Sequence, residues 1–303
     1  MAKVARPRRS VLYMPGSNTR ALEKGRGLPA DALILDLEDA VAADSKVQAR
    51  RNIMQAVGQG GYGYREIVVR INAFSTPWGY DDLVAVCGSK ADAVLLPKVE
   101  SADMVRQAAT VMDAHNAPPE MQIWAMMETP LGMLHAEQVA GAHPRLTCLV
   151  MGTSDLAKDL HASHTQDRMP MLTSLGLCLL AARAYQLDIL DGVHLDLRDD
   201  EGLAYSCQQG AQLGFDGKTL IHPRTIGIAN EAFAPSEAEV EWSHKIIEAH
   251  AAAMAEGKGV AVFEGKLIEN LHVENAHRMV QLAAAIAEQE KELAAQRDEA
   301  AAE

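Results

Sequence analysis

The chain has 303 residues, a length that suits one large α/β-barrel domain with additional elements, or two ordinary domains. Hydrophobic residues make up 48% of it, which is enough for a sizeable core and excludes a disordered chain. The 28 basic and 41 acidic residues give a formal net charge of -13, which excludes nucleic acid and anionic membrane as partners.

The four cysteines have no CxxC spacing, so they indicate a reducing compartment rather than a zinc knuckle. The N-terminal sequence MAKVARPRRS is basic and lacks the apolar region of a signal peptide. We interpret it as a basic arm, with a short recognition element as the alternative. Because no apolar run reaches the roughly 20 residues that span a bilayer, we expect a cytoplasmic protein.

Eight short apolar runs, most of them separated by amphipathic helical patterns, recur along the chain. They are Val11–Met14, Ala32–Leu37, Ile67–Ile71, Ala93–Leu96, Gln122–Met127, Thr147–Met151, Ile189–Leu195 and Thr219–Ile221. Buried runs that alternate with helices are typical of a parallel sheet. Eight such units predict an α/β fold, a (β/α)₈ TIM barrel, with a doubly wound open sheet as the alternative.

Beyond the last strand the pattern changes. An Ala/Glu-rich helix is predicted from about Ser236 to Met254, then a glycine break, a hairpin-like segment Val260–Ile268 and a final helix from about Val273. We therefore predict a TIM-barrel catalytic domain over residues 1–234 and a C-terminal helical and hairpin lid over residues 235–303.

The carboxyl ends of barrel strands carry the chemistry in enzymes of this architecture. Here they carry several carboxylates and no paired His or Cys, which favours Mg²⁺, with Mn²⁺ possible. Glu128 and Asp155 follow neighbouring strands and are the predicted metal ligands. Asp36, Glu38 and Asp39 are expected to orient metal-bound water. The alternative is that such residues are solvated, or pair as ordinary strand-end charges.

Small residues precede Asp155 in the run Gly152-Thr153-Ser154, which would allow backbone N–H groups to approach a ligand carboxylate. Four cations lie near the predicted barrel mouth and are candidates for contacts with coenzyme A. They are Lys98, Arg20, Lys24 and Arg26. For Arg20 and Arg26 a solubilising surface role is an equal alternative.

At these residues the sequence resembles the citrate lyase β-subunit-like family of CoA-ester lyases, within the HpcH/HpaI aldolase superfamily. The resemblance covers nearly the whole chain. Its motifs are RSVLYMPGSN (residues 9–18), LILDLEDAV (33–41), VVRIN (68–72), LLPKVE (95–100), METP (127–130), GTSDLAKDL (152–160), GFDGKTLIHP (214–223) and FEGKLIE (263–269).

The resemblance implies that Glu128 and Asp155 bind Mg²⁺ and that Arg70 stabilises a thioester enolate. It also implies a homotrimer, or a hexamer built from trimers, in which the lid of one subunit caps the active site of its neighbour. Family members commonly carry a catalytic Asp in the lid motif, where this chain has Glu269. We assign Glu269 the role of that acid, one methylene longer.

The resulting prediction is Mg²⁺-dependent cleavage of malyl-CoA, β-methylmalyl-CoA or citramalyl-CoA to an acyl-CoA and a 2-oxo acid, glyoxylate or pyruvate. A (3S)-malyl-CoA thioesterase is the first alternative, because the same groups could direct water onto the thioester. A citrate lyase β-subunit that acts with an acyl carrier protein is the second. A pyruvate aldolase acting on sugar acids is disfavoured by the FEGKLIE motif.

Overall fold

The computed structural model describes residues 6–257 and 261–302. The chain divides into two compact units. The first consists of residues 8–233, and the second contains the other described residues, including the chain from Ala234 onward. Each unit is described by itself below.

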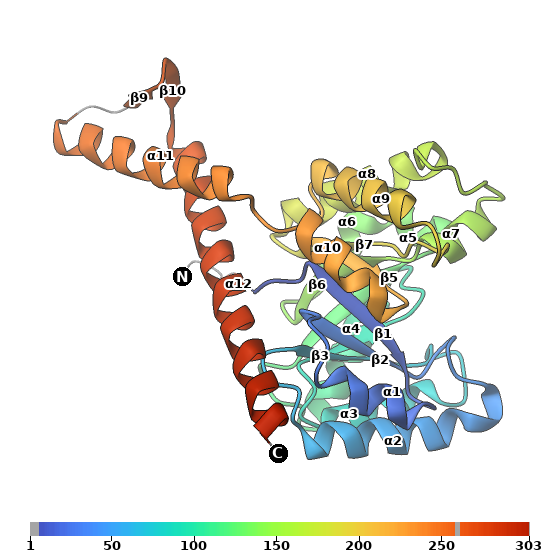
Figure 1. The fold of residues 1–303 in the computed structure, drawn as a ribbon. Coiled ribbons are helices and arrows are strands. Elements are labelled where there is room, and N and C mark those ends of the chain that lie inside the picture. Colours follow the sequence, from blue (N-terminus) through green and yellow to red (C-terminus); the bar gives the residue numbers. More distant parts are fainter. Residues whose placement is uncertain (1–5, 258–260, 303) are drawn as a thin grey trace. The chain divides into compact units, whose positions relative to one another are not determined.

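The first unit is built on a closed barrel of eight parallel strands in chain order (Figure 1). The strands are β1 (Ser10–Pro15), β2 (Ala32–Asp36), β3 (Glu66–Arg70), β4 (Ala93–Leu96), β5 (Gln122–Met127), β6 (Leu146–Met151), β7 (Asp188–Asp191) and β8 (Gly217–Leu220). Pairing of Val11 with Thr219 joins the first strand to the last. This closure confirms the predicted barrel and excludes an open, doubly wound sheet.

Helices alternate with the strands and cover the outside of the barrel (Figure 1). They are α1 (Thr19–Gly25), α2 (Lys46–Gln59), α3 (Gly79–Cys87), α4 (Ala102–Ala114), α5 (Pro130–Leu134), α6 (Ala136–Ala140), α7 (Thr153–Asp159), α8 (Leu172–Ala184), α9 (Asp200–Leu213) and α10 (Ile226–Ala232).

Side chains alternate between the barrel interior and the helix layer, because successive residues of a strand point to opposite faces. Ile34 and Val68 belong to the inner cluster, whereas Leu35 and Val69 pack against the helices. Two residues further along each strand, the inward positions become polar at the carboxyl end: Asp36 follows Ile34, Arg70 follows Val68, and Glu128 follows Met126. The alternation thus delivers three charged side chains to one end of the barrel.

Arg8 closes the opposite end of the barrel. Its Nε and Nη2 atoms each donate to an oxygen of Glu66 at 2.7 Å, and its Nη1 atom pairs with Asp188. Its guanidinium lies 4.9 Å from the ring centroid of Trp124. Burial opposes the charge of Arg8, but the bonds to Glu66 outweigh it and raise the pKa of Arg8.

The basic-arm interpretation is therefore wrong for the described part of the N-terminal sequence. Arg8 and Arg9 are only 4% and 5% exposed, and Arg9 donates to both carboxylate oxygens of Asp31. Both arginines are held in the interior by carboxylates at the amino ends of the strands, Glu66 at the start of β3 and Asp31 directly before β2. Residues 1–5 of that sequence lie outside the described residues.

The seventh strand is shorter than predicted. It ends at Asp191 instead of Leu195. A Cβ atom added at Gly192 would lie 2.4 Å from Oγ1 of Thr153, so the chain turns here at a position that only glycine accommodates. The longer prediction rested on the apolar residues up to Leu195, so it did not identify Asp191 as a strand-end residue.

The second unit contains α11 (Glu237–Ala255), the antiparallel hairpin of β9 (Ala261–Phe263) and β10 (Lys266–Ile268), and α12 (Asn270–Ala302). Ser236 and Glu239 form a capping box at the start of α11. Glu264 and Gly265 have φ of +48° and +76°, as tight hairpin turns require. The predicted helices and hairpin are thus confirmed, although Val260 lies outside the described residues.

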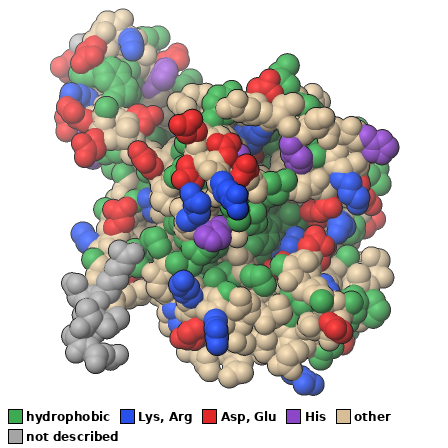
Figure 2. Space-filling model, turned by 45° about the vertical axis from the view of Figure 1, so that its right-hand side comes forward, with side chains coloured by type: hydrophobic (Ala, Val, Ile, Leu, Met, Phe, Trp, Pro, Cys, Tyr) green, Lys and Arg blue, Asp and Glu red, His purple; other side chains and the backbone are tan. Residues whose placement is uncertain are grey.

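Charged groups of both signs are interspersed on the surface. On the face shown in Figure 2, Lys and Arg side chains lie among Asp and Glu side chains. Among the described helices, none has the length and hydrophobicity needed to cross a membrane.

Candidate active site

Arg70 lies at the end of β3 and is held by the neighbouring strand. Its Nε and Nη2 atoms donate to the two oxygens of Asp36 at 2.7 and 2.6 Å. The two residues are directly paired in the sheet register, and both are almost fully buried. Burial opposes the charge of Arg70, but Asp36 outweighs it, so the pKa of Arg70 is raised and its charge is permanent.

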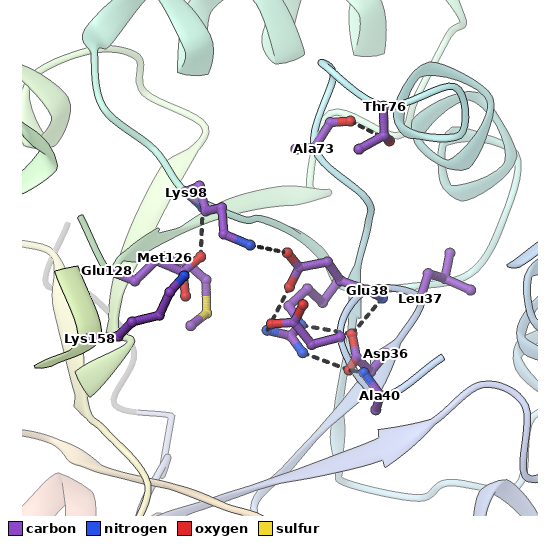
Figure 3. A network of polar contacts seen from close by, with 12 residues as sticks. Asp36, Leu37, Glu38, Ala40, Ala73, Thr76, Lys98, Met126, Glu128 and Lys158 are labelled. Atoms are coloured by element: carbon purple, nitrogen blue, oxygen red, sulfur yellow. Dashed lines mark hydrogen bonds and ion pairs between the residues drawn. The ribbon is translucent and has the colours of Figure 1, made fainter. Parts of the chain in front are cut away.

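Glu38 connects two cations at the barrel mouth. Its Oε2 atom lies 2.9 Å from Nη1 of Arg70, a close ion pair without hydrogen-bond alignment, and its Oε1 atom accepts from Nζ of Lys98 at 2.8 Å. The backbone of this loop is fixed by the buried Lys46, whose Nζ donates to the carbonyl oxygens of Leu37 and Glu38. Figure 3 shows Asp36 and Glu38, from the end of β2 and the loop after it, converging with Lys98, which follows β4.

Lys98 links Glu38 to the predicted metal site. Its backbone N–H donates to Oε1 of Glu128 at 2.8 Å while its side chain contacts Glu38 (Figure 3). Its φ of +49° is unusual for a residue other than glycine. Since its ammonium group is engaged by Glu38, Lys98 stands in the structure as an internal bridge between two carboxylates. Its predicted contact with coenzyme A stays a prediction.

Glu128 follows β5 and is 1% exposed. Burial, with Glu38 adding to it, raises the pKa of Glu128 to about 7, and Asp155 contributes in the same direction. Asp155 lies half-buried in the first turn of α7. The charge of Asp155 thus disfavours ionisation of Glu128, which is a condition that a bound cation would relieve.

The surroundings of Glu128 are compatible with a metal ion. A Cβ atom added at Gly152 would lie 2.5 Å from Oε2 of Glu128, so glycine at this position lets the carboxylate lie at the barrel mouth unobstructed. No group of three or more His, Cys, Asp or Glu residues with metal-binding geometry occurs within the described ranges. Mg²⁺ commonly uses one or two carboxylates and completes its shell with water and substrate, so a pair of carboxylates suffices.

The other predicted residues lie at different distances from this centre. Asp39 is 60% exposed at its side chain and 4.0 Å from Nη1 of Arg70. Thr153 is buried and Ser154 half-buried at the start of α7, whereas Arg20 and Lys24 lie at exposed positions of α1. Glu269 is exposed in the second unit, directly before α12.

Sequence reasoning missed Tyr13 and Lys46. Tyr13 lies on β1, and the guanidinium of Arg70 is 4.9 Å from its ring centroid. The hydroxyl of Tyr13 donates to Sδ of Met126 at 3.2 Å. Strand alternation could have identified Tyr13 as an inward residue. Lys46 gives no such signal, because it is the first residue of α2 and acts on backbone carbonyl groups.

A second buried cluster of charged side chains is centred on Asp191, at the end of β7. Asp191 is fully buried and accepts from Nη1 of Arg168 and from Nζ of Lys218, which also donates to Ser206. Arg168 belongs to the connection that follows α7. The cluster therefore ties that connection to β7, β8 and α9.

Fold and site together define an α/β-barrel enzyme with a carboxylate-rich mouth and a buried arginine. Residues 9–223 match the HpcH/HpaI aldolase/citrate lyase family, and the chain belongs to this family of enzymes. It is 52% identical to the (3S)-malyl-CoA thioesterase of Cereibacter sphaeroides over 95% of this chain and 98% of that protein.

The chain is also similar to a more distant relative that is named as a lyase. The chain is 33% identical to the L-malyl-CoA/beta-methylmalyl-CoA lyase of Cereibacter sphaeroides, over 93% of this chain and 96% of that protein. Among solved structures it resembles the CitE protein of Mycobacterium tuberculosis in complex with magnesium, acetoacetate and coenzyme A. The TM-score is 0.74 and the identity 31%, covering 93% of this chain and 100% of the other.

Proposed function

We propose that this protein hydrolyses the thioester of (3S)-malyl-CoA to malate and free coenzyme A. The observation that carries the proposal is the 52% identity, over nearly the full length of both chains, to a protein named for that activity. The lyase activity expected first from the sequence is the second candidate, because the relative named for it is only 33% identical.

The metal in this proposal is Mg²⁺, with Mn²⁺ as a substitute, held by Glu128 and Asp155. When bound, it supplies a positive charge for the oxygens at the malyl end of the substrate. Asp36 and Glu38 keep Arg70 oriented toward the mouth, and Asp39 adds a solvent-facing carboxylate beside it. Support for these assignments comes from the burial of Glu128 and from the room that Gly152 leaves beside it.

Hydrolysis adds water across the C–S bond. A water oxygen attacks the thioester carbonyl carbon, the C–S bond breaks, and the sulfur leaves with a proton as the thiol of coenzyme A. Arg70 stabilises the negative charge that develops on the carbonyl oxygen, because its cation is fixed before the reaction begins. Glu269, presented by the lid of a neighbouring subunit, accepts the proton of the attacking water.

The same groups also suit carbon–carbon cleavage. In that reaction the substrate hydroxyl loses its proton. The bond between the hydroxyl-bearing carbon and the carbon next to the thioester carbonyl then breaks, and a thioester enolate forms. Arg70 would stabilise the enolate oxygen and Glu269 would protonate the enolate carbon. The two reactions thus differ in whether water or the substrate hydroxyl is activated.

A product assay separates the two candidates. Malyl-CoA, β-methylmalyl-CoA and citramalyl-CoA are each incubated with the protein and Mg²⁺, and both free thiol and acyl-CoA are measured. Malate with free coenzyme A is the expected result. Acetyl-CoA with glyoxylate and no free thiol would establish the lyase instead, and turnover of none of the three esters would refute both.

The assembly and its partners belong to the same proposal. We place the catalytic barrel at residues 1–234 and the lid at residues 235–303, in a cytoplasmic homotrimer or hexamer that exchanges lids. Sedimentation analysis tests the subunit number. Dependence on an acyl carrier protein would favour the citrate lyase β-subunit alternative, and activity of the isolated protein on free CoA esters would exclude it.

A further inference from the structure

Tyr13 crosses the interior of the barrel. It lies on β1 and packs against the inner cluster, whereas its hydroxyl donates to Met126 on β5. The first and fifth strands of an eight-stranded barrel lie on opposite sides, so the ring spans the axis. Toward the carboxyl end of the barrel, the next inward-facing residues on the other strands include Asp36, Arg70 and Glu128. Tyr13 therefore lies directly beneath the charged groups of the mouth.

Solvent reaches Tyr13 from the mouth side. The side chain is half-buried although it points into a closed barrel. The other end of the barrel is sealed by Arg8 and Glu66, which are 4% and 0% exposed. The exposed part of Tyr13 therefore faces the same space as Glu128 and Arg70, and its ring forms the floor of that space.

The ring of Tyr13 also supports Arg70. The guanidinium carbon lies 4.9 Å from the ring centroid, a cation–π distance. Asp36 holds two donors of Arg70 along one edge, and Tyr13 covers one face of the guanidinium. Together they restrict both the direction and the tilt of the group.

The hydroxyl of Tyr13 is engaged by a weak partner. A thioether sulfur is a poor hydrogen-bond acceptor, and a hydroxyl hydrogen can rotate without movement of the ring. A tyrosine hydroxyl has an ordinary pKa of about 10 and is therefore a donor near neutral pH, and the surrounding barrel interior raises the pKa of Tyr13 further. A hydrogen bond from this hydroxyl to an anionic oxygen would be considerably stronger than its bond to the sulfur.

We propose that Tyr13 forms the floor of the acyl-binding site and that its hydroxyl turns from Met126 to donate a hydrogen bond to an anionic oxygen of the bound malyl group. The inference rests on the proposed malyl substrate, and it assigns the deepest contact of that substrate. Because Tyr13 is level with Ile34, one inward position below Asp36 and Arg70, the contact concerns the small-acid end of the substrate.

The test compares Tyr13→Phe with Tyr62→Phe. Tyr62 is a matched control, since it is buried, lies under the guanidinium of Arg26 and donates its hydroxyl to the Leu22 carbonyl. Binding of malate and, separately, of free coenzyme A is measured by calorimetry with Mg²⁺ present. Tyr13→Phe should weaken malate binding about tenfold, as loss of a hydrogen bond to a charged group does, and leave coenzyme A binding unchanged.

A Tyr13→Phe protein that binds malate as tightly as wild type overturns the proposal, and so does an equal loss for malate and coenzyme A. Tyr13→Leu removes the ring as well, and it should lower turnover further because Arg70 loses its support. A wild-type protein that binds malate but turns over no malyl ester refutes the proposed function alone. A wild-type protein that binds no malate overturns the proposed contact of Tyr13, and the product assay then decides the proposed function separately.

Discussion

Both oxygens of Asp36 accept hydrogen bonds from Arg70, at 2.7 and 2.6 Å, across two adjacent strands. A bidentate pair of this kind fixes the plane of the guanidinium as well as its position. Glu38 adds a second carboxylate 2.9 Å from Nη1. The arginine is therefore oriented before any ligand arrives, which is the condition under which a cation stabilises developing charge at little cost.

Arg70→Met should reduce turnover of the CoA ester at least about 100-fold, because the preorganised cation is lost while the volume is nearly kept. Mg²⁺ binding should persist, since Glu128 and Asp155 are unchanged. Stopped-flow or thiol-release assays and metal titration check the two statements. Near-normal turnover would refute the role of Arg70.

The same variant leaves Asp36 buried without its cation, so stability should fall by about 3–5 kcal/mol. Arg70→Met combined with Asp36→Asn should recover part of that loss without recovering turnover. The double variant thus separates catalysis from folding, and recovery of both together would contradict the argument.

The raised pKa of Glu128, about 7, predicts how Mg²⁺ binding depends on pH. Protons compete with the metal below this value, so apparent Mg²⁺ affinity should decrease as pH falls from 8 to 6. Calorimetric titration at several pH values checks this. A flat profile, or one that Glu128→Gln reproduces, would contradict the assignment of Glu128 as a ligand.

The free energy of unfolding of the metal-free protein should decrease as pH rises, which is opposite to the trend of the Mg²⁺ affinity. Because the folded-state pKa of Glu128 is raised, its contribution to stability is complete below about pH 4.5 and is lost as pH rises through about 7. Added Mg²⁺ should consequently raise the melting temperature more at pH 8 than at pH 6. A larger stabilisation at pH 6 would exclude this linkage.

Gly152→Ala should impair the metal site while the barrel stays folded. The new Cβ atom would lie 2.4 Å from Cβ and 2.5 Å from Oε2 of Glu128, so the carboxylate must move. We expect Mg²⁺ affinity to fall by about tenfold or more, as measured by titration. Gly58→Ala is the control, because nothing lies within 4 Å of its added Cβ. Equal affinity in both variants would contradict the geometry.

Much of the barrel and its mouth could be predicted from the sequence, because strands buried on both faces leave apolar runs and end in polar residues. Asp36, Arg70 and Glu128 were found in this way, and strand alternation explains why they meet. Glu38 and Lys98 were also placed at strand ends, but their contact with each other depends on a loop conformation that no local pattern encodes.

Other features depend on contacts between distant segments. Lys46 acts through Nζ on two backbone carbonyls, and Tyr13 reaches Met126, which is 113 residues away. Neither contact has a sequence signature. The basic residues Arg8 and Arg9 were misinterpreted because charge alone suggests solvent, whereas both pair with carboxylates that lie further along the chain, Glu66 at the start of β3 and Asp31 directly before β2.

The Arg8–Glu66 pair at the amino end of the barrel should contribute to the free energy of unfolding and not to catalysis. Arg8→Met removes the donor that both oxygens of the buried Glu66 accept from, which should cost about 3–5 kcal/mol. For a unit of this size, that corresponds to a fall in melting temperature of roughly 10 °C.

Turnover by the remaining folded Arg8→Met protein should stay close to that of wild type, since Arg8 lies at the end of the barrel opposite Glu128. Arg106→Met is the matched control, because the Arg106–Asp103 pair is largely exposed and should contribute little to stability. Calorimetry and a turnover assay on both variants check the expectation. A stable but inactive Arg8→Met protein would show that the two ends of the barrel are coupled.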